Sequence, residues 1–163
     1  MNAIKKEPET ESLILQEVEK PFRLLFPEFQ TIQTVVDSDS YVSFLVFLKD
    51  KTATVYEIRR HHSDNQNVLK IKTDVVTKNG KGTETQSLGW MTGCKADSIV
   101  EIFENKIARL WDMRQLQQAF IIKEWARPAK RLFEWTRHNP LLRTFGGDVP
   151  LSMLPQPLNE VTL

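Results

Sequence analysis

The 163-residue chain has little cysteine, no long hydrophobic run and no large excess of one charge, and each absence excludes a class of protein. Its single cysteine, Cys94, excludes an internal disulfide, and no set of Cys and His residues has the spacing of a zinc site. The longest strongly apolar run, Val42 to Leu48, is about seven residues, whereas a membrane-spanning helix needs ~18. The N-terminus is charged and lacks the apolar stretch of a secretory signal. We therefore expect a soluble, cytoplasmic protein without a membrane partner.

The composition is that of an ordinary globular domain. Apolar residues make up 40% of the chain and charged residues 26%, which excludes wholesale disorder and fibrous classes. No internal repeat and no low-complexity segment interrupts the sequence. At this length one hydrophobic core is sufficient, so we predict a single domain over residues 11–154 with tails at 1–10 and 155–163.

The positive charge is concentrated near the C-terminus. The net charge of the chain is +1, but residues 106–143 contain nine basic and three acidic side chains, a difference of +6. Most of the nine are arginine, whose planar guanidinium matches phosphate oxygens. This pattern favours a nucleic-acid partner, DNA in particular, and a solvated helix face is the alternative. The residues expected to contact phosphate are Arg127, Lys130, Arg131 and Arg137.

The first half of the chain changes from a helical to a strand period. From Glu11 to Phe26 apolar residues recur at spacings of three and four, which predicts an amphipathic helix that Pro21 kinks or splits. Three short segments rich in β-branched and aromatic residues follow, separated by turn residues, and the last two are expected to form a hairpin. These predicted strands are Phe29–Val36, Val42–Leu48 and Thr52–Arg59.

The second half alternates strands and helices. Clean alternation predicts a half-exposed strand from Asn67 to Val76, and Ser98–Phe103 with Ile107–Trp111 is expected to close as a hairpin. Helices are predicted from Met113 to Ile122, capped by Asp112, and from Pro128 to about Arg137. This order indicates an α+β or mixed α/β fold, in which an N-terminal helix and C-terminal helices flank a central mixed sheet. A doubly wound parallel sheet is excluded because the first strands lack intervening helices.

Common catalytic motifs are missing, so the candidate site depends on acidic residues of the predicted strands. The sequence contains no phosphate-binding glycine loop, no nucleophile elbow and no metalloprotease motif. Glu57 follows an apolar run, and the pattern Glu57-Ile58-Arg59 places Glu57 and Arg59 on one face of a strand. One nuclease class builds its Mg²⁺ site from a carboxylate and a cation at this spacing, the cation normally being lysine. An ion pair on a partly exposed strand is the alternative.

Several short motifs follow this strand in a fixed order, and together they carry a family resemblance. They are Gly89-Trp90, Lys95-Ala96-Asp97, Ile99-Val100, the run from Trp111 to Leu116 (WDMRQL), and Val149-Pro150-Leu151. With the preceding helix and strands, this order resembles the PD-(D/E)XK nucleases of the restriction-endonuclease-like fold, small phage and bacterial members above all. The resemblance covers roughly residues 11–154.

The resemblance implies a magnesium-dependent DNA endonuclease, but the catalytic positions depart from the family pattern. The family aspartate falls at or near Ser43, its lysine is replaced by Arg59, and a further acidic position falls near Ile71. Asp39 could substitute for the missing aspartate, and Asp37 is a weaker candidate. The predicted site is therefore Glu57, Arg59, Asp39 and Ser43, with Mg²⁺ held by Glu57 and Asp39 only if the protein is active.

Three functions remain open from the sequence. The chain is a divergent Mg²⁺-dependent phosphodiesterase, a degenerate member that binds DNA without cutting it, or a structural or assembly protein that keeps only the fold. Three departures at once favour an eroded site over a repaired one, while fold analogy alone does not establish activity. A homodimer is compatible with each of these functions.

Overall fold

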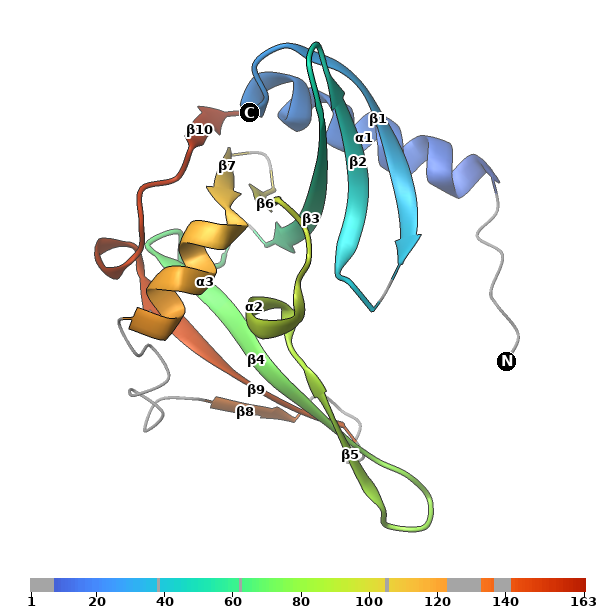
Figure 1. The fold of residues 1–163 in the computed structure, drawn as a ribbon, viewed down its shortest axis with the longest axis vertical. Helices are drawn as coiled ribbons and strands as arrows, with labels where there is room; N and C mark the ends of the chain where they lie inside the picture. The colour runs from blue at the N-terminus through green and yellow to red at the C-terminus, as the bar shows by residue number, and fades with distance from the viewer. Residues whose placement is uncertain (1–7, 38, 62, 105, 123–132, 137–141) are drawn as a thin grey trace.

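In the computed structural model, a mixed β-sheet lies between a long N-terminal helix and a second, smaller sheet (Figure 1). The structure describes residues 8–37, 39–61, 63–104, 106–122, 133–136 and 142–163. Within them the strand order is β1-β2-β3-β6-β7-β10 in the first sheet and β5-β4-β9-β8 in the second. The fold is mixed α+β with a central mixed sheet, as the order of predicted elements indicates.

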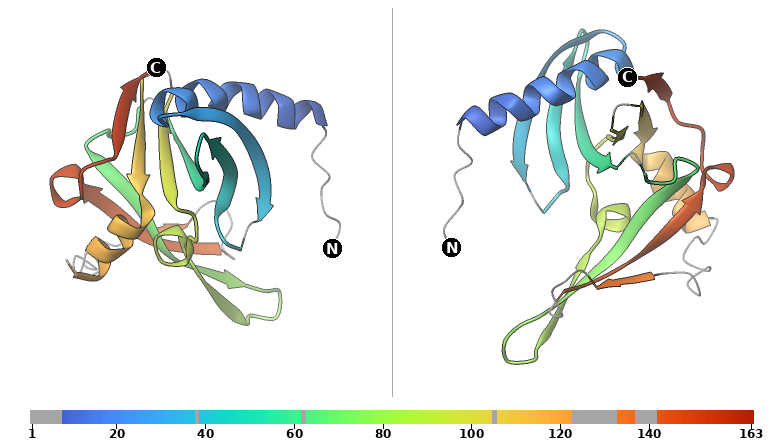
Figure 2. Two further views of the ribbon diagram at one scale, coloured as in Figure 1. Left: turned by 45° about the horizontal axis from the view of Figure 1, so that its top comes forward. Right: turned by 180° about the vertical axis from the view of Figure 1, so that it is seen from behind.

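Helix α1 (Pro8–Leu25) covers one face of the first sheet. Its residues Val18, Phe22 and Leu25 are fully buried, and their spacing of four and three places them on one stripe of the helix. The helix is not split at Pro21 and continues to Leu25, although proline has no N–H to donate to the carbonyl four residues earlier. Figure 2 shows α1 lying across the β1–β3 end of the molecule, away from β4 and β9.

The first sheet is built around the predicted hairpin. Antiparallel pairing of β2 with β3 is confirmed, with Phe44 opposite Val55, and β3 then pairs with β6 in parallel. The predicted hairpin of β6 and β7 is also confirmed. The strands of this sheet are β1 (Phe29–Asp37), β2 (Val42–Leu48), β3 (Thr52–Arg60), β6 (Ser98–Phe103), β7 (Ile107–Asp112) and β10 (Asn159–Thr162).

The sequence predicts a tail at residues 155–163, but part of this segment forms strand β10. Residues 159–162 pair antiparallel with β7 and form the edge of the first sheet. The side chain of Asn159 also donates a hydrogen bond to the Leu25 carbonyl at the end of α1 (3.0 Å). The short segment has weak strand periodicity, so only tertiary pairing reveals it. At the other end, α1 begins at Pro8, three residues before the predicted start.

The second sheet is formed by β4 (Val68–Lys78), β5 (Glu84–Leu88), β8 (Phe133–Thr136) and β9 (Leu142–Pro150). The prediction of a helix up to about Arg137 is wrong for residues 133–136, which pair with β9 as β8. Two aromatic residues and a threonine in this segment favour a strand once a neighbouring strand is available. The rest of the predicted helix, residues 128–132 and 137, lies outside the described residues.

Two short helices close the space between the sheets. Gly89 precedes helix α2 (Trp90–Gly93) as its N-cap. A Cβ atom at this position would lie 2.3 Å from the Lys72 carbonyl oxygen, so only glycine fits against β4. Helix α3 (Met113–Ile122) has its predicted cap, because Asp112 Oδ1 accepts a hydrogen bond from the Gln115 backbone N–H (2.8 Å). A one-turn 3₁₀ helix, Leu151–Met153, follows β9. No helix among the described residues is both long and apolar enough to span a membrane.

Candidate functional site

Glu57 and Arg59 lie on the face of β3 that α1 covers. Ala53 and Val55 belong to the core beneath α1, whereas Tyr56 and Ile58 pack toward the second sheet. Because side chains alternate along a strand, Glu57 and Arg59 continue the row of Ala53 and Val55. The apolar core beneath α1 ends after Val55, so the charged side chains of Glu57 and Arg59 lie at the edge of that core.

The Arg59 guanidinium joins two carboxylates from different elements. Its Nε atom donates to Glu57 Oε1 at 2.6 Å, and its Nη1 atom donates to Glu17 Oε2 at 2.8 Å. Glu17 comes from α1, so the contact fixes this helix against β3. We call Glu17, Glu57 and Arg59 the Glu57 cluster. Its side chains range from 11% exposed in Glu57 to 48% in Arg59 and 63% in Glu17, so the cluster is open to solvent on the Arg59 side.

Burial dominates the electrostatics of Glu57. Desolvation raises the pKa of the Glu57 carboxyl above its ordinary value, although the hydrogen bond and charge of Arg59 act in the opposite direction. For Arg59, burial alone lowers the pKa, but the Glu17 and Glu57 carboxylates together raise it. The Arg59 guanidinium is therefore permanently charged, and it lies beside the Glu57 carboxylate, whose charged form is destabilised by burial.

Ser43 lies next to Glu57, but it contacts the backbone. Its Oγ atom accepts a hydrogen bond from the Glu57 backbone N–H at 3.2 Å, directly beyond the last regular β2–β3 pair, Phe44 and Val55. The serine therefore continues the strand pairing where the main-chain register ends. An aspartate in place of Ser43 would therefore have its side chain attached next to the Glu57 backbone, where β2 and β3 meet.

The other predicted acidic positions lie elsewhere. Asp39 is exposed in the turn between β1 and β2, four residues before Ser43. Asp37 is the last residue of β1, opposite Val42. Ile71, at the position where the family has a further acidic residue, is 1% exposed in the core between the sheets. Among the described residues, no three His, Cys, Asp or Glu side chains are grouped so that they could hold a metal ion.

The predicted phosphate contacts, Arg127, Lys130, Arg131 and Arg137, fall outside the described residues. Of the other cations in the basic stretch, Lys106 and Arg114 are exposed, as a surface role requires. Arg109 is buried and takes part in ion pairs, so it belongs to the interior.

A second group of charges lies on the opposite face of the first sheet. Glu101 on β6 is fully buried, and its carboxylate is 3.3 Å from Arg60 Nε, 3.4 Å from Trp111 Nε1 and 3.6 Å from Arg109 Nη1. Arg109 Nε also donates to Glu160 on β10. Desolvation raises the pKa of the Glu101 carboxyl, and the neighbouring arginines oppose this shift. We call these five residues the Glu101 cluster.

Sequence reasoning missed Glu17. Glu17 directly precedes Val18, which belongs to the buried stripe of α1. A carboxylate at the border of that stripe is the feature of the sequence that could have indicated a contact with the sheet. Its partner is 42 residues away along the chain, so the pairing becomes visible only when α1 is packed on the sheet.

Comparisons with known proteins give a structural similarity and no sequence match. No protein-family model matches the sequence, and no curated protein matches it. Among solved structures, the chain is similar to that of a bacterial homing endonuclease, I-Ssp6803I, with a TM-score of 0.44. The two share 9% sequence identity, and the similarity covers 69% of this chain and 74% of the endonuclease chain.

Proposed function

We propose that the protein is a DNA-associated member of the PD-(D/E)XK nuclease-like class that binds DNA without cutting it. The observation that carries this proposal is the Arg59 guanidinium, which bridges Glu57 and Glu17 on the face where the family pattern has its metal site. The order of α1, the β1–β3 meander, the Gly89-Trp90 turn and parallel strand β6 also agrees with the resemblance.

The bridging arginine opposes metal binding. Mg²⁺ requires oxygen ligands in nearly octahedral geometry and gives up its waters reluctantly, so it depends on carboxylates with unoccupied oxygens. In the Glu57 cluster the carboxylates already pair with a cation that cannot lose its proton. A divalent ion at this place would have to displace the guanidinium or lie beside it. The residues present therefore do not fit a magnesium site.

The proposal of DNA binding is supported by the charge of residues 106–143, nine basic against three acidic side chains, of which one basic residue, Arg109, is buried and does not count toward phosphate contact. Each phosphate contact contributes about −0.9 to the slope of log K against log salt for duplex DNA. Replacing both Arg127 and Arg131 with glutamine should reduce that slope by about two. Absence of DNA binding at ~50 mM salt, or a slope unchanged in the variant, would contradict the proposal.

The loss of the metal site is tested by restoring the family residues at positions 43 and 59. We expect no plasmid nicking and no measurable heat of Mg²⁺ or Mn²⁺ binding for the wild-type protein. The double variant Ser43→Asp with Arg59→Lys supplies the family residues, and gain of metal binding or of nicking would support descent from a working nuclease. The single variants are the matched controls, and Glu57→Gln in the double background should abolish any gain.

The second candidate is an active phosphodiesterase in which Asp39 has replaced the family aspartate. It rests on the resemblance and on the place of Asp39 four residues before Ser43, whereas the Arg59 bridge between Glu17 and Glu57 counts against it. If it is correct, the wild-type protein nicks plasmid DNA with Mg²⁺, and both Asp39→Asn and Glu57→Gln abolish this activity. That result would exclude the eroded-site proposal.

A further inference from the structure

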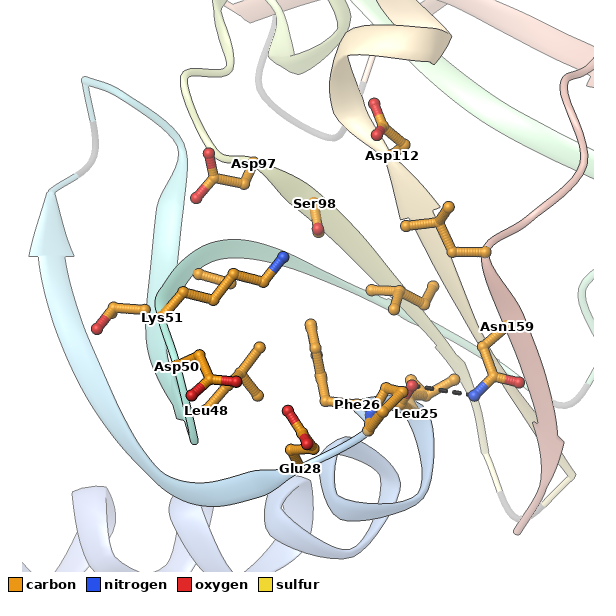
Figure 3. Close-up of a pocket in the computed structure, with 15 residues that line it drawn as sticks. Leu25, Phe26, Glu28, Leu48, Asp50, Lys51, Asp97, Ser98, Asp112 and Asn159 are labelled. Carbon is orange, nitrogen blue, oxygen red and sulfur yellow. Dashed lines mark hydrogen bonds between the residues drawn. The ribbon is translucent and has the colours of Figure 1, made fainter.

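A cavity of about 630 Å³ opens at the start of β3, at the other end of this strand from Glu57. It lies between the end of α1, the β2–β3 turn and the adjoining ends of β6, β7 and β10 (Figure 3). The volume is within the range of ~300–1,000 Å³ typical of small-molecule sites. Neither Arg59 nor Glu17 lines it, so it is separate from the Glu57 cluster.

The rim of the cavity is acidic. Four carboxylates line it, those of Glu28, Asp50, Asp97 and Asp112, against one ammonium group, that of Lys51. The formal charge is therefore one minus four, or −3. Figure 3 shows these carboxylates distributed around the cavity, with the Lys51 side chain extending between them.

Two of the carboxylates, those of Asp97 and Asp112, are each fixed by hydrogen bonds to one of their two oxygens. Asp97 Oδ2 accepts hydrogen bonds from both the backbone N–H and the hydroxyl of Thr54, each at 2.8 Å. Asp112 Oδ1 caps α3. The second oxygen of each group has no hydrogen bond within the described part of the chain. Both are therefore positioned to accept from a ligand without first losing side-chain freedom.

The wall between these two aspartates contains a buried hydroxyl that lacks a partner. Ser98 is only 8% exposed, and its side chain has no hydrogen bond to any described residue. Figure 3 shows its oxygen pointing into the cavity. A buried hydroxyl without a partner costs free energy, and a donor from a bound molecule would remove that cost.

The rest of the lining is apolar. Leu25 and Phe26 come from the end of α1, Leu48 and Leu110 come from β2 and β7, and Leu158 precedes β10. Leu158 is 54% exposed although it is a large hydrophobic residue. A ligand with an apolar body would cover this surface and gain from its removal from water.

We propose that this cavity binds an organic cation on an apolar body, an ammonium or guanidinium group attached to a hydrocarbon chain. The cationic group lies by Ser98 and the second oxygens of Asp97 and Asp112, and the hydrocarbon covers Leu48 and Leu158. Such a group occurs in free amines and in the basic side chains of peptides. A nucleic-acid ligand is excluded by the acidic rim.

Matched small probes test the charge preference. Hexylammonium should bind, with chemical-shift changes at the backbone amides of Ser98 and Asp112, whereas hexanoate of equal length should not. Their affinities should differ by at least tenfold. Equal binding of the two, or no binding of hexylammonium at ~10 mM, a concentration well above a millimolar Kd, would overturn the proposal.

Charge variants of the exposed rim test the site without disturbing the fold. The double change Glu28→Gln with Asp50→Asn should weaken hexylammonium binding about fivefold or more, because two attractive charges are removed. Lys51→Gln should strengthen it, because a competing cation is removed. Asp148→Asn, an exposed change on β9 outside the cavity, is the control and should have no effect. Unchanged affinity in both rim variants would contradict the proposal.

A final pair of probes distinguishes the two sources of the cation. A blocked Leu-Arg-Leu tripeptide that binds more tightly than hexylammonium indicates a basic side chain of a partner protein, and the reverse order indicates a free amine. Either order supports the site. The substitution Ser98→Ala should weaken the preferred probe while the free protein keeps or gains thermal stability, since the alanine removes the unpartnered hydroxyl.

Discussion

The Glu57 and Glu101 clusters pair arginine with glutamate side chains on opposite faces of the first sheet. In the Glu101 cluster the carboxylate is fully buried and two arginines and a tryptophan point at it. In the Glu57 cluster one arginine serves two glutamates and remains half exposed. The interactions are alike, but the surroundings of the charges differ.

The arginines of the Glu101 cluster also bond to the connection between β3 and β4 and to the first residues of β4. Arg109 Nη1 donates to the Gln66 carbonyl at 2.8 Å, and Arg60 Nη2 donates to the Lys70 carbonyl at 3.2 Å. Removing one of these groups leaves the remaining buried atoms without partners. In the Glu57 cluster, water can replace any lost partner of Arg59. Charge pairing is thus structural in one cluster and replaceable in the other, and a replaceable pair can change without loss of the fold.

The largest effect is expected for Arg109→Met, which leaves Glu101 buried with less compensation. Breaking a buried ion pair from one side costs about 3–5 kcal/mol of unfolding free energy. Urea unfolding, followed by tryptophan fluorescence and by circular dichroism, measures this loss. A loss below about 1 kcal/mol would remove the distinction between the clusters, since exposed pairs contribute that much.

A smaller effect is expected for Glu160→Gln at the edge strand. The Glu160 side chain is 48% exposed, so water screens its pair with Arg109 and the loss should be about 0.5–1 kcal/mol. The glutamine keeps an oxygen that can accept from Arg109 Nε. Hydrogen exchange of the β10 amides should increase more than that of β6, because β10 is held at one edge only. Equal increases in both strands would indicate that the pair supports the whole sheet.

Arg59→Met is the matched counterpart of Arg109→Met. We expect less than about 1 kcal/mol of destabilisation, because Arg59 is 48% exposed and its pairs are screened. The remaining Glu57 side chain can take up a proton, which avoids a buried charge. The same urea titration measures both variants. A loss as large as that of Arg109→Met would show that the Glu57 cluster is also structural.

Much of the fold follows from local sequence patterns. The β2–β3 and β6–β7 hairpins and α3 with its Asp112 cap could be predicted, because alternation, turn residues and a capping side chain act within a few residues. Strand β10 could not, because it is short and its partner β7 is distant in the sequence. Strand β8 pairs with the next strand, β9, but its four residues are too few to show a strand period. A helix was therefore predicted where β8 forms.

The site was predictable only along one strand. The spacing of Glu57 and Arg59 places both on one face, and this requires no tertiary information. The contribution of Glu17 depends on the packing of α1 against the sheet, 42 residues away along the chain. Ser43 meets Glu57, and Ser98 meets Asp112, across predictable hairpins, but the register that brings these residues together is set in the assembled sheet. A sequence indicates which residue types are available, but the assembled sheet decides which of them meet.

The smallest effect concerns the pH dependence of stability at Glu57. Burial raises the pKa of this carboxyl above its ordinary value of 4.5, so the folded protein binds more protons than the unfolded chain between these two values. The resulting contribution to stability is fully present below the unfolded pKa and is lost as pH rises through the folded pKa. Glu57→Gln removes it, so the difference in unfolding free energy, wild type minus variant, should fall as pH increases above 4.5. In an Arg59→Met background the opposing hydrogen bond is missing, and the fall should extend to higher pH. A difference that rises with pH would mean that the ion pair with Arg59 outweighs burial, and the Glu57 cluster would then resemble an ordinary surface salt bridge.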